Sequence, residues 1–260
     1  MTAIHGTTPS TGAGWTKEQW LRSFRHEAAR FSASVDPTRL DAAVPSCPGW
    51  TVYDLIAHVA GVYRWHRQHL QRRTASTPRH ERPEVPAGMP VLTWWQREFT
   101  AMAQELDAVS PTEPAWNWAG RPPVALFWHR RMAHETALHR WDAENALGVR
   151  HSVDSTLWTD GVTEVLDTFL PGGRNAGISG PTGTVALTAT DTGAQWRIAV
   201  RESGVLLAPR ADFPGASPAP DCTAEGTTED LLLVLWGRAT AADRLRVQGD
   251  ATLLRCLRAR

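Results

Sequence analysis

The sequence predicts a mainly α protein in two parts, a four-helix bundle over residues 15–150 and a small α+β domain over residues 151–260. Two patterns predict this division. In the first part, four long segments carry apolar residues at three- and four-residue spacing and are separated by loops, which is typical of an antiparallel bundle. In the second part, segments of alternating apolar and polar residues lie between shorter helices, which indicates mixed α+β structure. Residues 1–14 are polar, and we expect a flexible N-terminus.

The first two helices of the predicted bundle begin at capping boxes, in which the side chain before the helix and the side chain three residues later bond each other's backbone. The capping pairs are Thr16 with Gln19 and Thr51 with Asp54. The second helix follows "CPGW" at 47–50, which breaks the chain. Both helices continue with apolar residues at helical spacing, so each has one face for the core.

The third helix follows a Pro- and Arg-rich loop at 72–90 and has one apolar face from Leu92 to Val109. Another loop, "PTEPAWNWAGRPP", leads to the fourth helix. We expect this helix to start at Pro122 and Pro123, because proline suits the first turn, and to stop at Gly148, which suits a left-handed cap.

The second part begins with a helix at about 155–170 that "PGGR" should end. Two alternating segments predict strands, and "ESG" turns the second into a further strand. A capped helix, a short strand and a last helix complete the prediction. These segments are "TVALTATD", "WRIAVRE", "VLLAP", "TTEDLLLVLWGRA", "RLRVQ" and "DATLLRCLRAR".

The composition excludes several classes of protein. Acidic and basic residues balance at 27 each, which argues against nucleic-acid or membrane-surface binding driven by net charge. Three cysteines without a CxxC pattern predict a reducing cytoplasm, and no signal peptide or membrane span is apparent. We expect a soluble cytoplasmic monomer or small homo-oligomer. Only Lys17 among the basic residues is a lysine, which indicates a GC-rich genome of the actinobacterial kind.

The fourth helix carries the first candidate site. Glu135 and His139 lie four residues apart, about 40° around the axis, so they project side by side, whereas His134 and His139 are about 140° apart. On the second helix, His58 lies on the stripe that faces the other helices, and His66 is about 12 Å further along. Two imidazoles and one carboxylate would leave a tetrahedral zinc with one open position. An ordinary ion pair between Glu135 and His139 is the alternative.

The segments "VPSCPGWTVYDLIAHVAGVYRW" at 44–65 and "HETALHRWDAENALG" at 134–148 resemble the two signature segments of the mycothiol-dependent maleylpyruvate isomerase family, which belongs to the DinB-like metalloenzymes. In the second part, "DGVTEVLDTFLP" at 160–171 and "TTEDLLLVLWGR" at 227–238 resemble the sterol-carrier-like C-terminal domain of that family. The resemblance spans residues 15 to 255. It implies a DinB-like four-helix bundle followed by a sterol-carrier-like α+β domain.

The resemblance also implies a chemistry. In that family the bundle holds a divalent metal, usually zinc, through residues that match His58, Glu135 and His139. A catalytic arginine near the end of the second domain matches Arg238. Mycothiol, a low-molecular-weight thiol, would bind the open metal position, ionise, and add to a small electrophilic substrate. An isomerase then releases the thiol, whereas an S-transferase keeps the C–S bond. Arg238 would bind a substrate carboxylate.

Several neighbouring residues have two interpretations. Asp142 orients His139 behind the metal, or it pairs with Arg140 on the surface. His134 contacts substrate, or it is exposed or caps the helix. Cys47 has no histidine partner nearby in the sequence, which favours a structural role. The remaining candidates line the pocket or belong to the core, and they are Trp50, Trp65 and Trp141.

Two other classes of function fit the same sequence. A non-catalytic protein would bind an apolar small molecule in its sterol-carrier-like domain and would not need His139. A metal-dependent hydrolase would use the same bundle with water in the open position. Formation of a C–S bond distinguishes the thiol-dependent enzyme from both.

Overall fold

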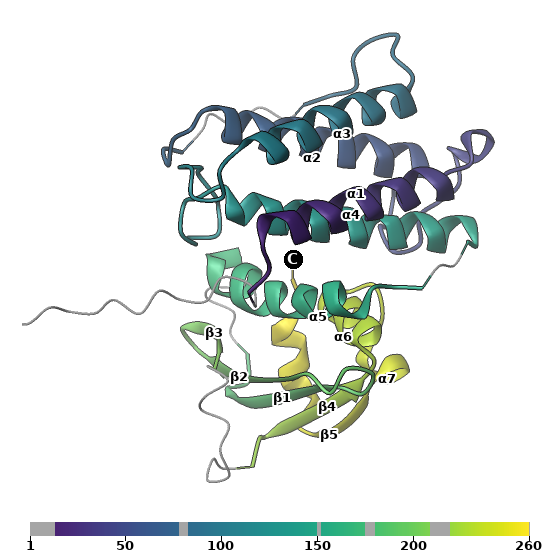
Figure 1. Cartoon of the computed structure of the whole chain (residues 1–260). Helices are drawn as coiled ribbons and strands as arrows, with labels where there is room; N and C mark the ends of the chain where they lie inside the picture. Colours follow the sequence, from purple (N-terminus) through teal and green to yellow (C-terminus); the bar gives the residue numbers. More distant parts are fainter. Residues whose placement is uncertain (1–13, 78–82, 150–151, 175–179, 209–218, 260) are drawn as a thin grey trace, which may run out of the picture.

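The computed structural model of the chain describes residues 14–77, 83–149, 152–174, 180–208 and 219–259. The N-terminal segment 1–14, for which flexibility is expected, lies outside these ranges except for its last residue. Helices fill the first part of the chain, and a five-stranded sheet with further helices fills the second (Figure 1). The predicted fold class, mainly α followed by α+β, is confirmed.

Four long helices form the bundle, and the capping boxes predicted for the first two are present. The helices are α1 (Lys17–Ser34), α2 (Val52–Gln71), α3 (Val91–Ala108) and α4 (Leu126–Leu147). A short 3₁₀ turn, η1 (Pro37–Arg39), follows α1. Helix α1 packs chiefly on α4 and α2 on α3, and Tyr63 on α2 is hydrogen-bonded to Thr136 on α4 at 2.6 Å. This bond fixes how α2 and α4 align along the side that carries the candidate site.

The predicted start of α4 is wrong by several residues. The helix begins at Leu126, because the two prolines before it belong to a looped segment. The backbone N–H of Ala115 donates to the carbonyl of Pro123 at 2.8 Å, and Val124 forms a bridge with Pro114. The predicted stop is correct, since Gly148 caps the helix in the left-handed conformation with φ of 72°.

The first helix of the second part is α-helical in its first half and π-helical in its second half. Helix α5 (Ser155–Glu164) is capped by Asp154, and its α-helical part ends earlier than predicted. A π-helical segment, η2 (Val165–Arg174), continues it through Pro171, where a break was expected. The wider π-helical turn uses i→i+5 bonds, so the backbone accommodates residues that an α-helix excludes.

The sheet has the order β3-β2-β1-β4-β5, with β1 and β4 parallel and the other neighbours antiparallel. The strands are β1 (Gly183–Ala189), β2 (Gln195–Arg201), β3 (Gly204–Leu207), β4 (Cys222–Gly226) and β5 (Arg246–Gly249). The sequence analysis missed β4, because "CTAEG" is short and rich in small and polar residues. The strand lies second from the edge, so it is nevertheless paired on both sides.

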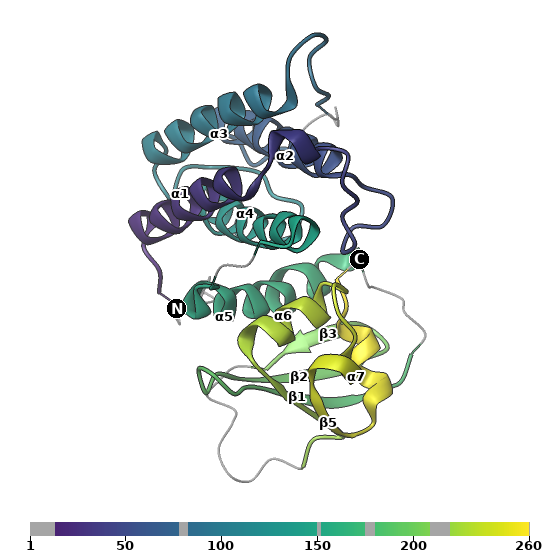
Figure 2. The ribbon, with the colours of Figure 1, turned by 90° about the vertical axis from the view of Figure 1, so that its right-hand side faces the viewer.

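Three more helical segments complete the chain: α6 (Thr228–Leu235), α7 (Ala241–Arg244) and the 3₁₀ segment η4 (Ala251–Leu257). An α-helix was predicted where η4 lies. Helices α5 and α6 pack together between the bundle and the sheet (Figures 1 and 2). The loop after α6 therefore comes close to α4, which brings the two parts of the chain together at one site.

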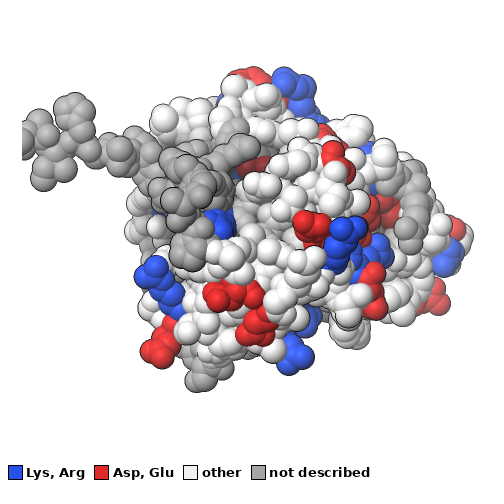
Figure 3. All heavy atoms as spheres, turned by 90° about the horizontal axis from the view of Figure 1, so that it is seen from below, with Lys and Arg blue, Asp and Glu red and all other residues white. Residues whose placement is uncertain are grey.

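Charges of both signs are interspersed on the face seen from the sheet side of the molecule (Figure 3). Within the described ranges, none of the helices combines the length and apolarity that crossing a bilayer requires.

Candidate active site

His58, Glu135 and His139 come together between α2 and α4. Helical spacing places Glu135 and His139 on one side of α4, and His58 faces them from α2. Oε1 of Glu135 lies 3.2 Å from Nε2 of His58 and 3.3 Å from Nε2 of His139. One ligand atom from each residue lies within 4.8 Å of the others.

The chemistry of these atoms fits a metal ion. Asp142 accepts a hydrogen bond from Nδ1 of His139 at 2.9 Å, so a neutral imidazole carries its proton there and presents a lone pair at Nε2. Nε2 faces Oε1 of Glu135 at 3.3 Å, so a metal ion bound by the neutral ring would take the place of the proton that otherwise lies between these two atoms. Two imidazole nitrogens and one carboxylate oxygen are the ligands that Zn²⁺ and similar divalent ions take.

The electrostatics of the site follow from the same contacts. Burial alone would raise the pKa of Glu135, but His139, His58 and Arg131 hold it well below its usual value. Burial alone would lower the pKa of His139, but Glu135 and the hydrogen bond to Asp142 raise it to about 9. In the metal-free protein His139 is therefore protonated and pairs with Glu135, and a metal ion would bind in exchange for this proton.

Asp142 lies behind His139 and is fully buried. Its carboxylate accepts two hydrogen bonds from Arg238, from Nε at 3.2 Å and from Nη2 at 2.9 Å. Burial opposes ionisation of Asp142, but the bond from His139 and the charge of Arg238 hold its pKa well below the usual value. The alternative of a surface pair with Arg140 is wrong, because Arg140 bonds Glu27 and Glu144 on the side facing α1.

A glycine directs the loop that carries Arg238. Gly237 follows α6 with φ of +69°, and a Cβ at this position would collide with the guanidinium of Arg258. The two residues that flank Gly237 contact each other. The guanidinium carbon of Arg238 lies 5.6 Å from the ring centroid of Trp236, and Nη1 of Arg238 donates to the backbone carbonyl of Trp236. The turn therefore points Arg238 toward the bundle.

Cys47 lies closer to the site than its structural interpretation suggested. Its Sγ is 3.6 Å from Asp142 and 3.9 Å from Nη2 of Arg238, and it forms a second possible ligand group with His139 and Asp142. Burial and the charge of Asp142 raise the pKa of the Cys47 thiol to about 11. In the metal-free protein the thiol is therefore protonated at neutral pH, and a protonated thiol is a poor nucleophile.

Sequence analysis missed Arg131. Its Nη2 donates to Oε2 of Glu135 at 3.0 Å, and its Nη1 donates to Glu164 of α5. Arg131 is almost completely buried, which is unusual for a charged side chain and is the kind of burial that paired partners permit. The only signal in the sequence was its position one turn before Glu135.

The two remaining predicted residues lie elsewhere on the helices. His134 is buried, and its Nε2 is bonded to Asp160 of α5 at 2.8 Å, so the expectation of an exposed or capping role is wrong. Trp65 packs its ring against His66, His69 and Trp116. Trp50 is the tryptophan whose ring lies beside the site, with centroid distances of 4.8 Å to His58 and 6.4 Å to His139.

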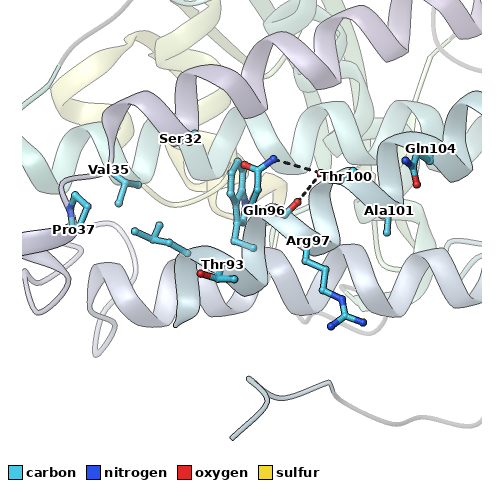
Figure 4. A pocket seen from close by; sticks show the side chains of 11 residues that line it. Ser32, Val35, Pro37, Thr93, Gln96, Arg97, Thr100, Ala101 and Gln104 are labelled. Atoms are coloured by element: carbon cyan, nitrogen blue, oxygen red, sulfur yellow. Dashed lines mark hydrogen bonds between the residues drawn. The ribbon is translucent and has the colours of Figure 1, made fainter. Parts of the chain in front are cut away.

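A separate groove of about 760 Å³ lies between the end of α1 and α3 (Figure 4). Ser32, Val35 and Pro37 line one side, and residues of α3 that include Gln96 and Thr100 line the other. None of the metal-ligand candidates lines this groove, so it is not part of the site.

Comparison with known proteins connects this geometry to a family. A family model described as "Mycothiol maleylpyruvate isomerase N-terminal domain" matches residues 21–144, and a model described as "MDMPI C-terminal domain" matches residues 157–255. The chain belongs to the mycothiol-dependent maleylpyruvate isomerase family. His58, Glu135 and His139 lie in the first matched range and Arg238 in the second, so both family domains contribute to the site.

Solved structures of this family have the same fold. The structure of a mycothiol-dependent maleylpyruvate isomerase is 14% identical, with a TM-score of 0.58, and a histidine-to-alanine variant is 15% identical, with a TM-score of 0.65. Both comparisons cover 92% of this chain and 95% of the solved chain. No curated protein matches the sequence.

Proposed function

We propose that this member of the maleylpyruvate isomerase family is a cytoplasmic enzyme that uses a divalent metal, with zinc the expected ion, to activate mycothiol for addition to a small electrophile. Family membership supports the thiol. The observation that carries the metal is the convergence of three lone-pair atoms, from His58, Glu135 and His139, within 4.8 Å of one another. Without a cation or a proton between them, these atoms would only repel each other.

The chain's own residues have separate roles in this proposal. His58, Glu135 and His139 hold the ion, and Asp142 fixes the tautomer and orientation of His139 by accepting its Nδ1 proton. The ring of Trp50 covers the two imidazoles and limits the access of water. A bound divalent ion lowers the pKa of a thiol that coordinates it, so that thiolate forms at neutral pH.

The reaction that follows is an addition to a carbon–carbon double bond. The sulfur forms a C–S bond as the π electrons move onto the conjugated carbonyl, and the remaining single bond rotates. Elimination of the thiolate restores the double bond in the trans geometry, so atoms and charge balance. An S-transferase would instead protonate the adduct and release it with the C–S bond intact.

We assign Arg238 chiefly to positioning. Its Nε and Nη2 both donate to Asp142, and its Nη1 donates to a backbone carbonyl, so its donors are largely occupied. To bind a substrate carboxylate as well, the guanidinium would have to share these donors. Holding Asp142 against His139 requires no such exchange.

The test is metal analysis together with a product assay. Purified wild-type protein is expected to contain one divalent ion per chain, and His58→Ala and Glu135→Ala are expected to lose it. His66→Ala is the matched control, because His66 lies two turns further along α2 and outside the cluster. Wild-type protein without a stoichiometric ion would refute the metal site.

The assay combines maleylpyruvate with the loaded enzyme, with and without mycothiol, and analyses the products by mass spectrometry. Thiol-dependent isomerisation or a C–S adduct supports the proposal. Turnover that ignores the thiol would favour a hydrolase with water at the metal. Unchanged retention of an apolar ligand by His139→Ala, without thiol chemistry, would favour a binding protein.

A further inference from the structure

The two oxygens of the Glu135 carboxylate have different surroundings. Oε1 faces the imidazoles of His58 and His139, at 3.2 Å and 3.3 Å. Oε2 points the other way and accepts a hydrogen bond from Nη2 of Arg131 at 3.0 Å. A cation between the imidazoles therefore meets one oxygen of this carboxylate, and the second oxygen is already bonded.

The C-terminal domain holds Arg131 in place. The other arm of the guanidinium, Nη1, donates to Glu164 of α5, whose side chain is only 2% exposed. The guanidinium carbon lies 5.1 Å from the ring centroid of Phe169 in η2 and 6.0 Å from that of Trp236 after α6. These distances suit cation–π contact, and rings and carboxylate together leave the side chain little freedom to turn away from Glu135.

The charges explain why Glu164 is needed. An arginine beside a metal ligand repels the cation, and burying it without a partner is costly. Glu164 supplies the compensating negative charge from the far side. Elsewhere in the same interface, Arg130 forms ion pairs with Asp160 and Asp167, and neither of these two carboxylates touches Glu135.

We propose that Arg131 is a positioning residue that restricts Glu135 to a single metal-facing oxygen, and that Glu164 holds Arg131 in this role from the C-terminal domain. The inference rests on the proposed metal site. With Oε2 occupied, the site offers an ion three protein donors and keeps a position for the thiol. Without Arg131, the carboxylate is free to rotate and offer both oxygens, and it then competes with the thiol for that position.

Cobalt(II) is the probe, because the intensity of its visible absorption bands falls as its coordination number rises. Metal-free wild-type protein, Arg131→Met and Glu164→Gln are loaded with Co²⁺ and their spectra compared. We expect weaker, shifted bands in Arg131→Met, a smaller change of the same kind in Glu164→Gln, and a loss of roughly 10–100-fold in activity of the zinc form. Titration with mycothiol should show weaker thiol binding to the Co²⁺ form of Arg131→Met.

Asp160→Asn is the matched control, because it breaks a buried bond of the same interface without touching Glu135. It should lower thermal stability and leave the Co²⁺ spectrum unchanged. Glu164→Gln is nearly isosteric, so it provides the test if Arg131→Met fails to fold. Wild-type spectra in both site variants, or the same spectral change in Asp160→Asn, would overturn the inference and leave the proposed function standing. A wild-type protein that binds no Co²⁺ would refute both.

Discussion

Two groups of charged side chains lie on different sides of α4, and they differ in the contacts that their members make. Toward α1, Arg140 is fully buried between Glu27 and Glu144, so a base meets acids and the protein itself supplies every charge. Toward α2, one oxygen of Glu135 faces Nε2 of both His58 and His139, and Arg131 bonds the other oxygen. Burial alone therefore does not distinguish a functional cluster from a structural one. The distinguishing feature is that ligand atoms of three residues, His58, Glu135 and His139, converge within 4.8 Å of one another.

Arg140→Met should give the largest effect on stability. It leaves two carboxylates buried without their cation, and removal of one partner from such a cluster costs about 3–5 kcal/mol. Urea unfolding of the metal-free protein measures the loss. The folded fraction should still bind one divalent ion, because Arg140 contacts none of the three proposed ligands. A loss below about 1 kcal/mol would mean that the two clusters do not differ as described.

His139→Ala should have a small effect on stability and a large effect on metal binding, the reverse of Arg140→Met. Glu135 keeps Arg131 as a partner and Asp142 keeps Arg238, so the free energy of unfolding of the metal-free protein should fall by only about 1–2 kcal/mol. Metal affinity should fall by more than the roughly 100-fold that loss of a supporting residue can cost. Competition with a chelator measures the affinity. Wild-type affinity in this variant would remove His139 from the site.

Asp160→Asn should change stability without changing metal binding, and its effect on stability should depend on pH. Burial opposes ionisation of Asp160, but the charge of Arg130 and the bond from His134 hold its pKa below the usual value. A carboxyl group with a lowered folded pKa stabilises the protein above its unfolded pKa of about 3.9, and this contribution is lost as the pH falls through the folded pKa. The variant should be less stable by about 1–3 kcal/mol at pH 7.

Because of that linkage, the difference in unfolding free energy between wild type and Asp160→Asn should shrink as the pH falls from about 5 toward 3. Unfolding in urea at several pH values measures it. A difference that stays constant over this range would show that the ionised form of Asp160 contributes nothing to the interface.

Local sequence rules account for much of the fold and for the geometry of the ligand candidates. The capping boxes at Thr16 and Thr51 depend on side chains three residues apart, and the pairing of Glu135 with His139 depends on one helical turn. Both are visible without tertiary structure. The placement of His58 opposite them required only that the stripe of α2 face the bundle.

Local sequence rules do not reveal the residues that support the ligand candidates, because the partners of these residues lie far along the chain. The bond from Arg238 to Asp142 spans 96 residues, and the bond from Arg131 to Glu164 spans 33. His134 was misjudged for the same reason, since its partner Asp160 belongs to another domain. Charged side chains are usually exposed, so a sequence predicts an exposed arginine or histidine unless its buried partner is known.

Gly237 has a consequence for how this enzyme could be altered. Any other residue there must adopt a left-handed backbone conformation that L side chains rarely take, and this strain falls on the turn between Trp236 and Arg238. Libraries intended to change substrate preference should therefore keep this position fixed and vary the side chains around it. The backbone conformation of one glycine, rather than any reactive group, limits how far this loop can vary.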